Sequence, residues 1–137
     1  MVDGKIYIEI VRLFFSFLIN EFGFNQIKET ENGNAFYDVE YRDGKRAISI
    51  SYENVEDYLQ VIVFMLKNGN LSDYDDKTHT LHLSELNKII LPRIYKKEVE
   101  ENNILFSKYE ANDSLGRKLL KSAKELRLIL KNWDLLT

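Results

Sequence analysis

Apolar residues near the start of the chain recur every three or four positions, which is the spacing of one helical face. The repeat predicts an α-helix over residues 3–22. Asp3 suits the N-cap, because its carboxylate can accept a hydrogen bond from a free N–H of the first turn. Gly23 suits the stop, because glycine readily takes the left-handed conformation that follows a helix. The expected buried face contains Ile6, Ile10, Leu13, Phe14, Phe17, Leu18 and Phe22, widened by Val11, Phe15 and Ile19.

The following segments alternate between apolar and polar positions, which is the pattern of half-buried β-strands. Asp43-Gly44 separates two such segments and is a strong signal for a hairpin. Residues 58–66 are apolar on both faces, as in a central strand. We therefore predict an antiparallel meander of about four strands joined by short loops. The expected strands cover residues 24–31, 35–42, 45–52 and 58–66, and residues 78–83 can add one more short strand.

Helical spacing returns in the last part of the chain. Ser84 is a candidate cap for a short helix that ends at Ile90, and Pro92 suits the first turn of the next helix. The last helix should begin near Asn112 or Asp113 and form a hairpin with the preceding helix. The expected apolar stripes are Tyr95, Val99, Asn102, Phe106 and Tyr109 on one helix, and Leu115, Leu119, Ala123, Leu126, Leu130 and Trp133 on the other.

The order of helix, meander and helices is typical of an α+β fold. We expect an N-terminal helix, the antiparallel meander, and C-terminal helices packed on one sheet face. A length of 137 residues without a linker or internal repeat predicts a single domain over residues 1–137.

The most apolar stretch, residues 11–19, is too short to span a bilayer, and Arg12 interrupts it. Its flanks lack both the basic character and the cleavage site of a signal peptide, because Asp3 and Glu9 accompany Lys5. We expect a cytoplasmic protein that does not bind a membrane. The absence of cysteine excludes disulfides and thiolate chemistry.

Charge is unevenly distributed along the chain. The net charge is −3, and residues 1–110 are acidic whereas residues 111–137 are basic. The basic side chains of the last helix are a possible nucleic-acid face, but we interpret them as a solvated surface. A sequence pI near 5.5 argues against a nucleic-acid binder, because phosphate contacts need a net basic surface.

Two acidic segments are candidate sites for a protein partner with a basic surface. One surrounds an aromatic residue in a loop, and the other lies in a turn between two expected strands. Tyr74 or Tyr58 could serve as the aromatic anchor. Both segments could instead be solubilising loops. The candidate partner-binding residues are Asp73, Tyr74, Asp75 and Asp76 in the loop, and Glu53, Glu56 and Asp57 in the turn.

Metal and cofactor sites are not expected. His79 and His82 are the chain's two histidines, and on a strand their spacing of three places them on opposite faces. The acidic loop lacks the glycine and the final glutamate of a calcium-binding loop, since Thr78 and Ser84 stand at those positions.

Catalysis is not expected either. Phosphate-binding glycine loops and the nucleophile elbow of hydrolases are absent from the sequence. Asp38 and Glu40 share one strand face with Arg42, which is typical of cross-strand pairing on a solvated face. The eight tyrosines are expected mainly in the core, with a binding face as the alternative.

The stretch from Phe22 to Leu66 joins a helix ending in Glu-Phe-Gly-Phe, a strand, Val-Glu-Tyr, a short turn, Ile-Ser-Ile-Ser-Tyr-Glu and a final apolar strand. In this layout, roughly the first half of the chain resembles immunity proteins of bacterial polymorphic and contact-dependent toxin systems, and uncharacterised proteins grouped with them. The resemblance implies a cytoplasmic protein that binds a cognate toxin domain and blocks its active site, without catalysis of its own. It assigns no functional residue, because these families lack shared motifs.

The leading hypothesis is therefore a non-enzymatic binding protein that neutralises a toxin by direct contact. The alternative is a structural or regulatory protein that self-associates, for example as a homodimer, through the first helix or the helical hairpin. A third class, binding of a small ligand between sheet and helices, remains open.

Overall fold

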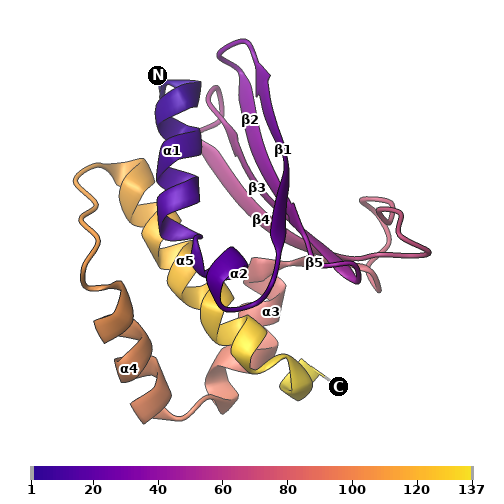
Figure 1. Ribbon diagram of the computed structural model, residues 1–137, viewed down its shortest axis with the longest axis vertical. Helices are drawn as coiled ribbons and strands as arrows, with labels where there is room; N and C mark the ends of the chain where they lie inside the picture. The colour runs from indigo at the N-terminus through magenta and orange to yellow at the C-terminus, as the bar shows by residue number, and fades with distance from the viewer. Residues whose placement is uncertain (1, 137) are drawn as a thin grey trace. The chain divides into compact units, whose positions relative to one another are not determined.

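The structure is a computed structural model that describes residues 2–136. It confirms the α+β class, with an N-terminal helix, an antiparallel meander and C-terminal helices (Figure 1). The chain forms two compact units, residues 1–82 and residues 83–137. We call them unit 1 and unit 2 and describe each by itself. A single domain over residues 1–137 stays a prediction.

Unit 1 begins with two helices, α1 (Gly4–Phe14) and α2 (Phe17–Asn20). Asp3 is the N-cap of α1, as predicted, and its Oδ2 accepts from the N–H of Ile6 at 3.2 Å. The prediction of one helix over residues 3–22 is wrong, because the chain turns at residues 15–16. The N–H of Leu18 bonds the carbonyl of Phe15 at 3.0 Å, a tighter turn than an α-helix makes. Gly23 ends this region with φ of 72°.

Among residues 2–136, no helix is both long enough and apolar enough to cross a lipid bilayer.

A five-stranded antiparallel sheet with the order β1-β2-β3-β4-β5 follows. The segment predicted as a possible additional strand is therefore part of the sheet, as its short edge strand β5. The loop after Arg42 is longer than the predicted two-residue turn, because residues 43–45 lie between the strands and Gly44 has φ of 92°. The strands are β1 (Asn25–Asn32), β2 (Phe36–Arg42), β3 (Arg46–Glu53), β4 (Tyr58–Met65) and β5 (Thr80–His82).

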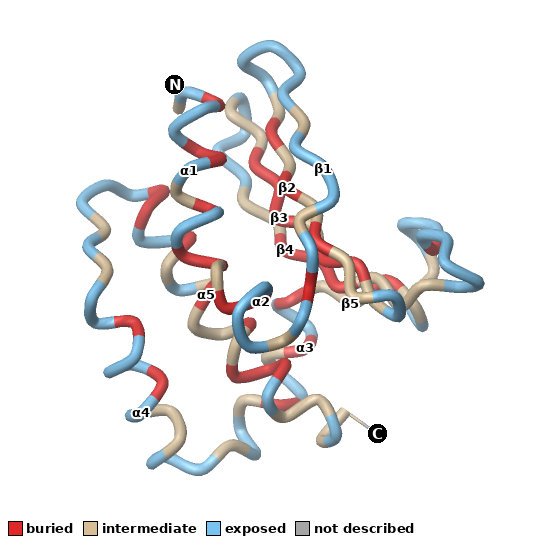
Figure 2. The backbone as a smooth tube through the Cα atoms, in the orientation of Figure 1, coloured by how far each residue is buried: buried red, intermediate tan, exposed pale blue. Residues whose placement is uncertain are grey.

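The two faces of the sheet differ in character. The inner face is the one against which α1 packs, and Figure 2 shows the buried positions concentrated on β2, β3 and β4. Its buried residues are Tyr37, Val39, Tyr41, Ile48, Ile50, Tyr52, Val61 and Val63. We call the opposite side the open face; it is only partly exposed, since Ala47, Ser51 and Ile62 on it are buried. It carries polar residues on the central strands, including Asp38, Ser49, Ser51 and Gln60.

Tyr7 fixes the rotation of α1 over the inner face. Its hydroxyl donates to the carbonyl of Ile50 at 2.7 Å, and its ring lies 5.6 Å from the ring of Tyr37. The predicted buried face is therefore wrong in part. Ile6 and Leu13 are 53% and 54% exposed, because the helix turns its larger aromatic residue toward the sheet.

Unit 2 consists of helices alone. They are α3 (Leu83–Ile90), the 3-10 helix η1 (Leu91–Arg93), α4 (Lys96–Phe106), α5 (Ser114–Lys131) and the 3-10 helix η2 (Trp133–Leu136). Ser84 lies inside the first turn of α3 and does not precede it. Pro92 belongs to η1, which ends because Ile94 and Tyr95 are extended, so α4 begins later than predicted.

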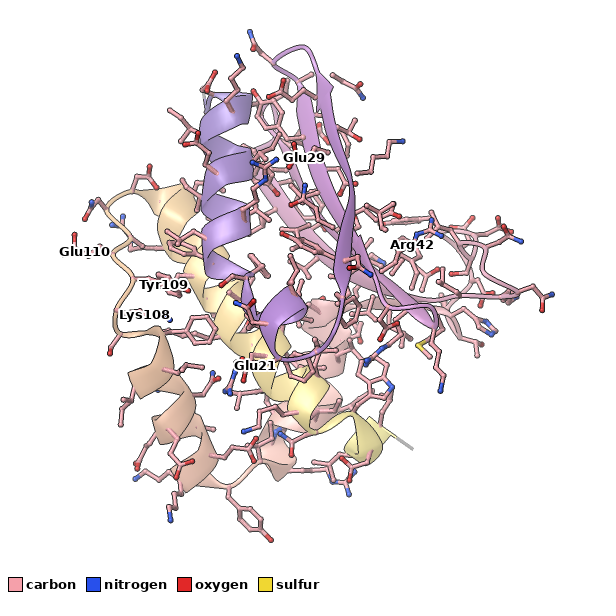
Figure 3. The ribbon with its side chains drawn as sticks, viewed as in Figure 1. Glu21, Glu29, Arg42, Lys108, Tyr109 and Glu110 are labelled. Atoms are coloured by element: carbon pink, nitrogen blue, oxygen red, sulfur yellow. The ribbon has the colours of Figure 1, made fainter. Side chains whose placement is uncertain are left out.

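The predicted hairpin of α4 and α5 is present in unit 2. Asp113 is the N-cap of α5, and its Oδ1 accepts from the N–H of Gly116 at 2.6 Å. Lys108, Tyr109 and Glu110 lie in the segment that joins the two helices (Figure 3). The stripe of α5 is buried from Leu115 to Leu130, whereas the α4 stripe is buried only at Asn102 and Phe106.

Candidate functional site

Four side chains from two strands and a loop meet on the open face. Gln60 on β4 donates from Nε2 to the hydroxyl of Tyr74 at 3.0 Å. The same nitrogen lies 3.3 Å from Nδ1 of His82 and 3.5 Å from the hydroxyl of Tyr58. We call Tyr58, Gln60, Tyr74 and His82 the tyrosine–glutamine cluster.

Both tyrosines of the cluster present aromatic surface to solvent. Tyr58 is 53% exposed and Tyr74 is 61% exposed. The ring of Tyr74 stands edge-on to the ring of His82, with centroids 5.4 Å apart and planes at 89°. Contacts at both its hydroxyl and its ring hold Tyr74 in one orientation, so an exposed ring is presented at little entropic cost.

The loop that carries Tyr74 joins β4 to β5 and is tied down next to it. Ser72 and Thr80 share a buried hydroxyl–hydroxyl hydrogen bond of 2.8 Å. The hydroxyl of Thr80 also approaches the carbonyl of Asp73 at 2.6 Å. Arg42 of β2, labelled in Figure 3, donates to the carbonyl of Gly69 within the same loop at 3.2 Å.

The three predicted loop carboxylates play different parts. Asp76 accepts from Lys67 at 2.9 Å, from His79 at 3.0 Å, and from backbone N–H groups of residues 78 and 79. The hydrogen bond from Lys67, followed by that from His79, lowers the pKa of Asp76 below its usual range. Asp76 therefore organises the loop. Asp73 and Asp75 are exposed on either side of Tyr74 in the chain.

The three predicted turn carboxylates also differ in their contacts and exposure. Glu53 pairs in register with Tyr58 and is half-buried beside the tyrosine–glutamine cluster. Glu56 is exposed. Asp57 accepts at 2.5 Å from the hydroxyl of Tyr52, an inner-face residue, and so belongs to the other side of the sheet. Burial, followed by the hydrogen bond to Asp57, raises the pKa of Tyr52 to about 12.

Of the residues predicted from the sequence, the structure thus places Tyr74 in the cluster and Glu53 beside it, opposite Tyr58. It directs Asp57 and Asp76 to other contacts. Sequence reasoning missed Gln60 and His82. A signal for Gln60 was present, because it is the one amide within the otherwise apolar β4, and a half-buried amide needs partners. The signal for His82 is its spacing of two from Thr80, because residues two apart on a strand lie on the same face of the sheet.

Asp38 lies further across the open face, on β2. Its Oδ1 accepts from the hydroxyl of Ser49 at 2.5 Å. Burial raises the pKa of Asp38, against the opposing effect of the Ser49 hydrogen bond. Arg42 forms an ion pair with Glu40 at 2.6 Å. The expected solvated row of charges is therefore half-buried, and Asp38 pairs with a serine and not with Arg42.

The open face offers contacts for recognition: an amide, two phenols, an imidazole and several carboxylates. Within residues 2–136, no group of three or more histidine, aspartate or glutamate side chains is placed to hold a metal ion. His79 bonds Asp76 within the loop, whereas His82 belongs to the tyrosine–glutamine cluster.

Searches of protein-family models, of curated proteins and of solved structures found no match to this chain. A role for the tyrosine–glutamine cluster is therefore argued from its geometry and from the carboxylates next to it.

Proposed function

We propose that this chain is a non-enzymatic binding protein that engages a basic surface of a protein partner through its open sheet face. The tyrosine–glutamine cluster is the observation that carries this proposal. It presents two exposed tyrosines next to the carboxylates of Glu53, Asp73 and Asp75. One of the two, Tyr74, is held by contacts at both its hydroxyl and its ring. Tyrosine is enriched at protein interfaces, because it adds apolar area, a hydrogen bond and little rotamer entropy.

Charge supports a basic partner. Unit 1 carries 14 acidic and 8 basic residues, a net charge of −6. A surplus of one sign raises the rate at which an oppositely charged protein is encountered, and it disfavours partners of the same sign. Rigid aromatic anchors then supply the short-range contacts that slow dissociation.

The partner class that we propose is a toxin domain, in a bacterial cytoplasm. The layout from Phe22 to Leu66 resembles immunity proteins, which act by occupying a toxin's active site. Enzymes that cleave nucleic acids need basic clefts, and an acidic open face is complementary to such a cleft. Binding alone neutralises the toxin, so catalytic groups are not required.

The first experiment is capture of the partner from lysate of the native host with the tagged protein, followed by mass spectrometry. We expect one stoichiometric partner with a basic surface. Capture with Asp73→Asn/Asp75→Asn should fall, because two exposed carboxylates are lost while the Asp76 contacts that organise the loop remain. Undiminished capture by this variant would place the interface elsewhere.

A second candidate function is self-association through α1, which one observation favours. Ile6 and Leu13 are exposed on the same side of the helix, with Ile10 half-buried between them. An exposed apolar stripe at this spacing is typical of helix pairing. Light scattering across a concentration series would then reveal a dimer that Ile6→Gln/Leu13→Gln abolishes. A monomer at all concentrations would exclude this function.

A further inference from the structure

Unit 2 contains a groove of about 320 Å³ between α4 and α5, next to η1. Its floor is apolar and is formed by Leu91, Val99 and Leu128. Pockets for small molecules have volumes of roughly 300–1,000 Å³, so this groove is at the small end of that range. A partner helix would need a longer channel.

A buried polar side chain among the lining residues joins the two helices. Asn102 is 1% exposed, donates to the carbonyl of Lys124 at 3.0 Å and accepts from Arg127 at 2.8 Å. Asn132 donates to Glu98 at 2.7 Å and closes the other end of the hairpin. These hydrogen bonds join α4 to α5, and Val99 of α4 is left only half-buried.

Positive charge borders the apolar floor. Lys121 and Lys124 line the groove, and within residues 2–136 neither ammonium group forms an ion pair. Glu125 is the acidic residue among the lining side chains. Unit 2 as a whole has a net charge of +3, so its field favours an anion.

We propose that this groove binds a small amphipathic carboxylate, with the apolar body on Leu91, Val99 and Leu128 and the carboxylate toward Lys121 and Lys124. An apolar floor with a few charged groups at its edge is the usual composition of a small-molecule site. The ligand is free in solution and not part of a membrane. The site belongs to unit 2 and shares no residue with the tyrosine–glutamine cluster of unit 1, and the proposal does not depend on the proposed partner binding.

The test uses the full-length protein and sodium decanoate, followed by backbone amide NMR. Saturable shifts should concentrate on Val99, Lys124 and Leu128. The neutral probe 1-decanol should bind at least about tenfold more weakly, because it cannot pair with the lysines. Equal binding of decanol, or shifts spread over the protein, would overturn the proposal. Binding only to vesicles of anionic lipid would also overturn it.

Charge variants separate this site from nonspecific adsorption. Lys121→Gln/Lys124→Gln should weaken decanoate binding at least about tenfold, and Glu125→Gln should strengthen it. The matched control is Lys88→Gln/Lys97→Gln, which removes the same charge outside the groove and should leave affinity unchanged. Equal losses in both double variants would contradict the proposal. Lys88, Lys97 and Lys121 are exposed and Lys124 is half-buried, and a folded amide spectrum checks each variant.

Discussion

Folding takes the carboxylate of Asp38 largely out of water and leaves it with the hydroxyl of Ser49 as its hydrogen-bond donor. A buried carboxylate without an ion-pair partner lowers stability. On the inner face, by contrast, the hydroxyl of Tyr7 stabilises the fold, because it joins α1 to the backbone of β3. Single polar groups on the two faces thus have opposite effects on stability.

Replacing Asp38 by asparagine should raise the melting temperature at about pH 7, because Asn keeps the acceptor for Ser49 and removes the buried charge. Burial raises the folded-state pKa of Asp38, so the ionised form costs stability above that pKa. The cost is lost as the pH falls through the folded pKa toward the unfolded value of about 3.9. The difference in melting temperature between Asp38→Asn and wild type should therefore shrink on acidification.

Differential scanning fluorimetry between about pH 4 and pH 8 measures this difference. Glu56→Gln, the same change at an exposed position, is the control and should show a smaller effect. A less stable Asp38→Asn protein at about pH 7 would mean that the carboxylate stabilises the sheet.

Removing the hydroxyl of Tyr7 should weaken the attachment of α1. Tyr7→Phe keeps the ring contacts with Tyr37 and Tyr52 and loses the bond to the carbonyl of Ile50. The expected decrease in the free energy of unfolding is about 1 kcal/mol, the typical net value of one such bond. Urea denaturation measures it, with exposed Tyr95→Phe as the control. Equal stability of the two variants would refute the assigned role of this hydroxyl.

At the scale of elements, local patterns predict the sheet better than the helices. Alternation from residue 36 to residue 53 specifies two strands, and Asp43-Gly44 marks the connection between them. The register was not predicted, because a two-residue turn would pair Arg42 with Lys45, whereas Arg42 pairs with Ala47. The helical repeat alone does not predict which face of α1 is buried. Apolar residues surround this helix, and the choice between Ile6 and Tyr7 depends on a hydrogen bond to a strand 43 residues away.

The candidate site, too, is predicted from local sequence patterns only in part. Tyr58 and Tyr74 were predicted as anchors, and both are exposed. The carboxylates could not be sorted from the sequence, because Asp76 and Asp57 differ from Asp73 and Asp75 only in the hydrogen bonds that the fold provides. Gln60 required the strand register, since it meets Tyr74 and His82 only when β4 and β5 pair.

Capping of α5 can be tested by one substitution. Asp113→Ala removes the acceptor for the N–H of Gly116, and the expected loss of stability is about 1 kcal/mol. Thermal denaturation measures the loss. Asn112→Ala at the neighbouring exposed position is the control. If both variants matched wild type, the helix would not depend on its cap.

At the scale of the molecule, charge is divided between the two units. Unit 1 is acidic and carries the tyrosine–glutamine cluster, whereas unit 2 is basic and carries the groove between α4 and α5. Long-range attraction between exposed charges is screened by salt, with a Debye length of about 8 Å at physiological ionic strength. Partner association with unit 1 should therefore slow as salt is added, while contacts of the tyrosine rings persist.

The affinity of the captured partner for Tyr58→Ala/Tyr74→Ala, measured by isothermal titration calorimetry, tests the central claim most directly. We predict at least about a tenfold loss of affinity, because both aromatic anchors are removed. Tyr95→Ala, at an exposed tyrosine of unit 2, should bind like wild type. Wild-type affinity in the double variant, with its fold intact, would contradict a binding role for the tyrosine–glutamine cluster.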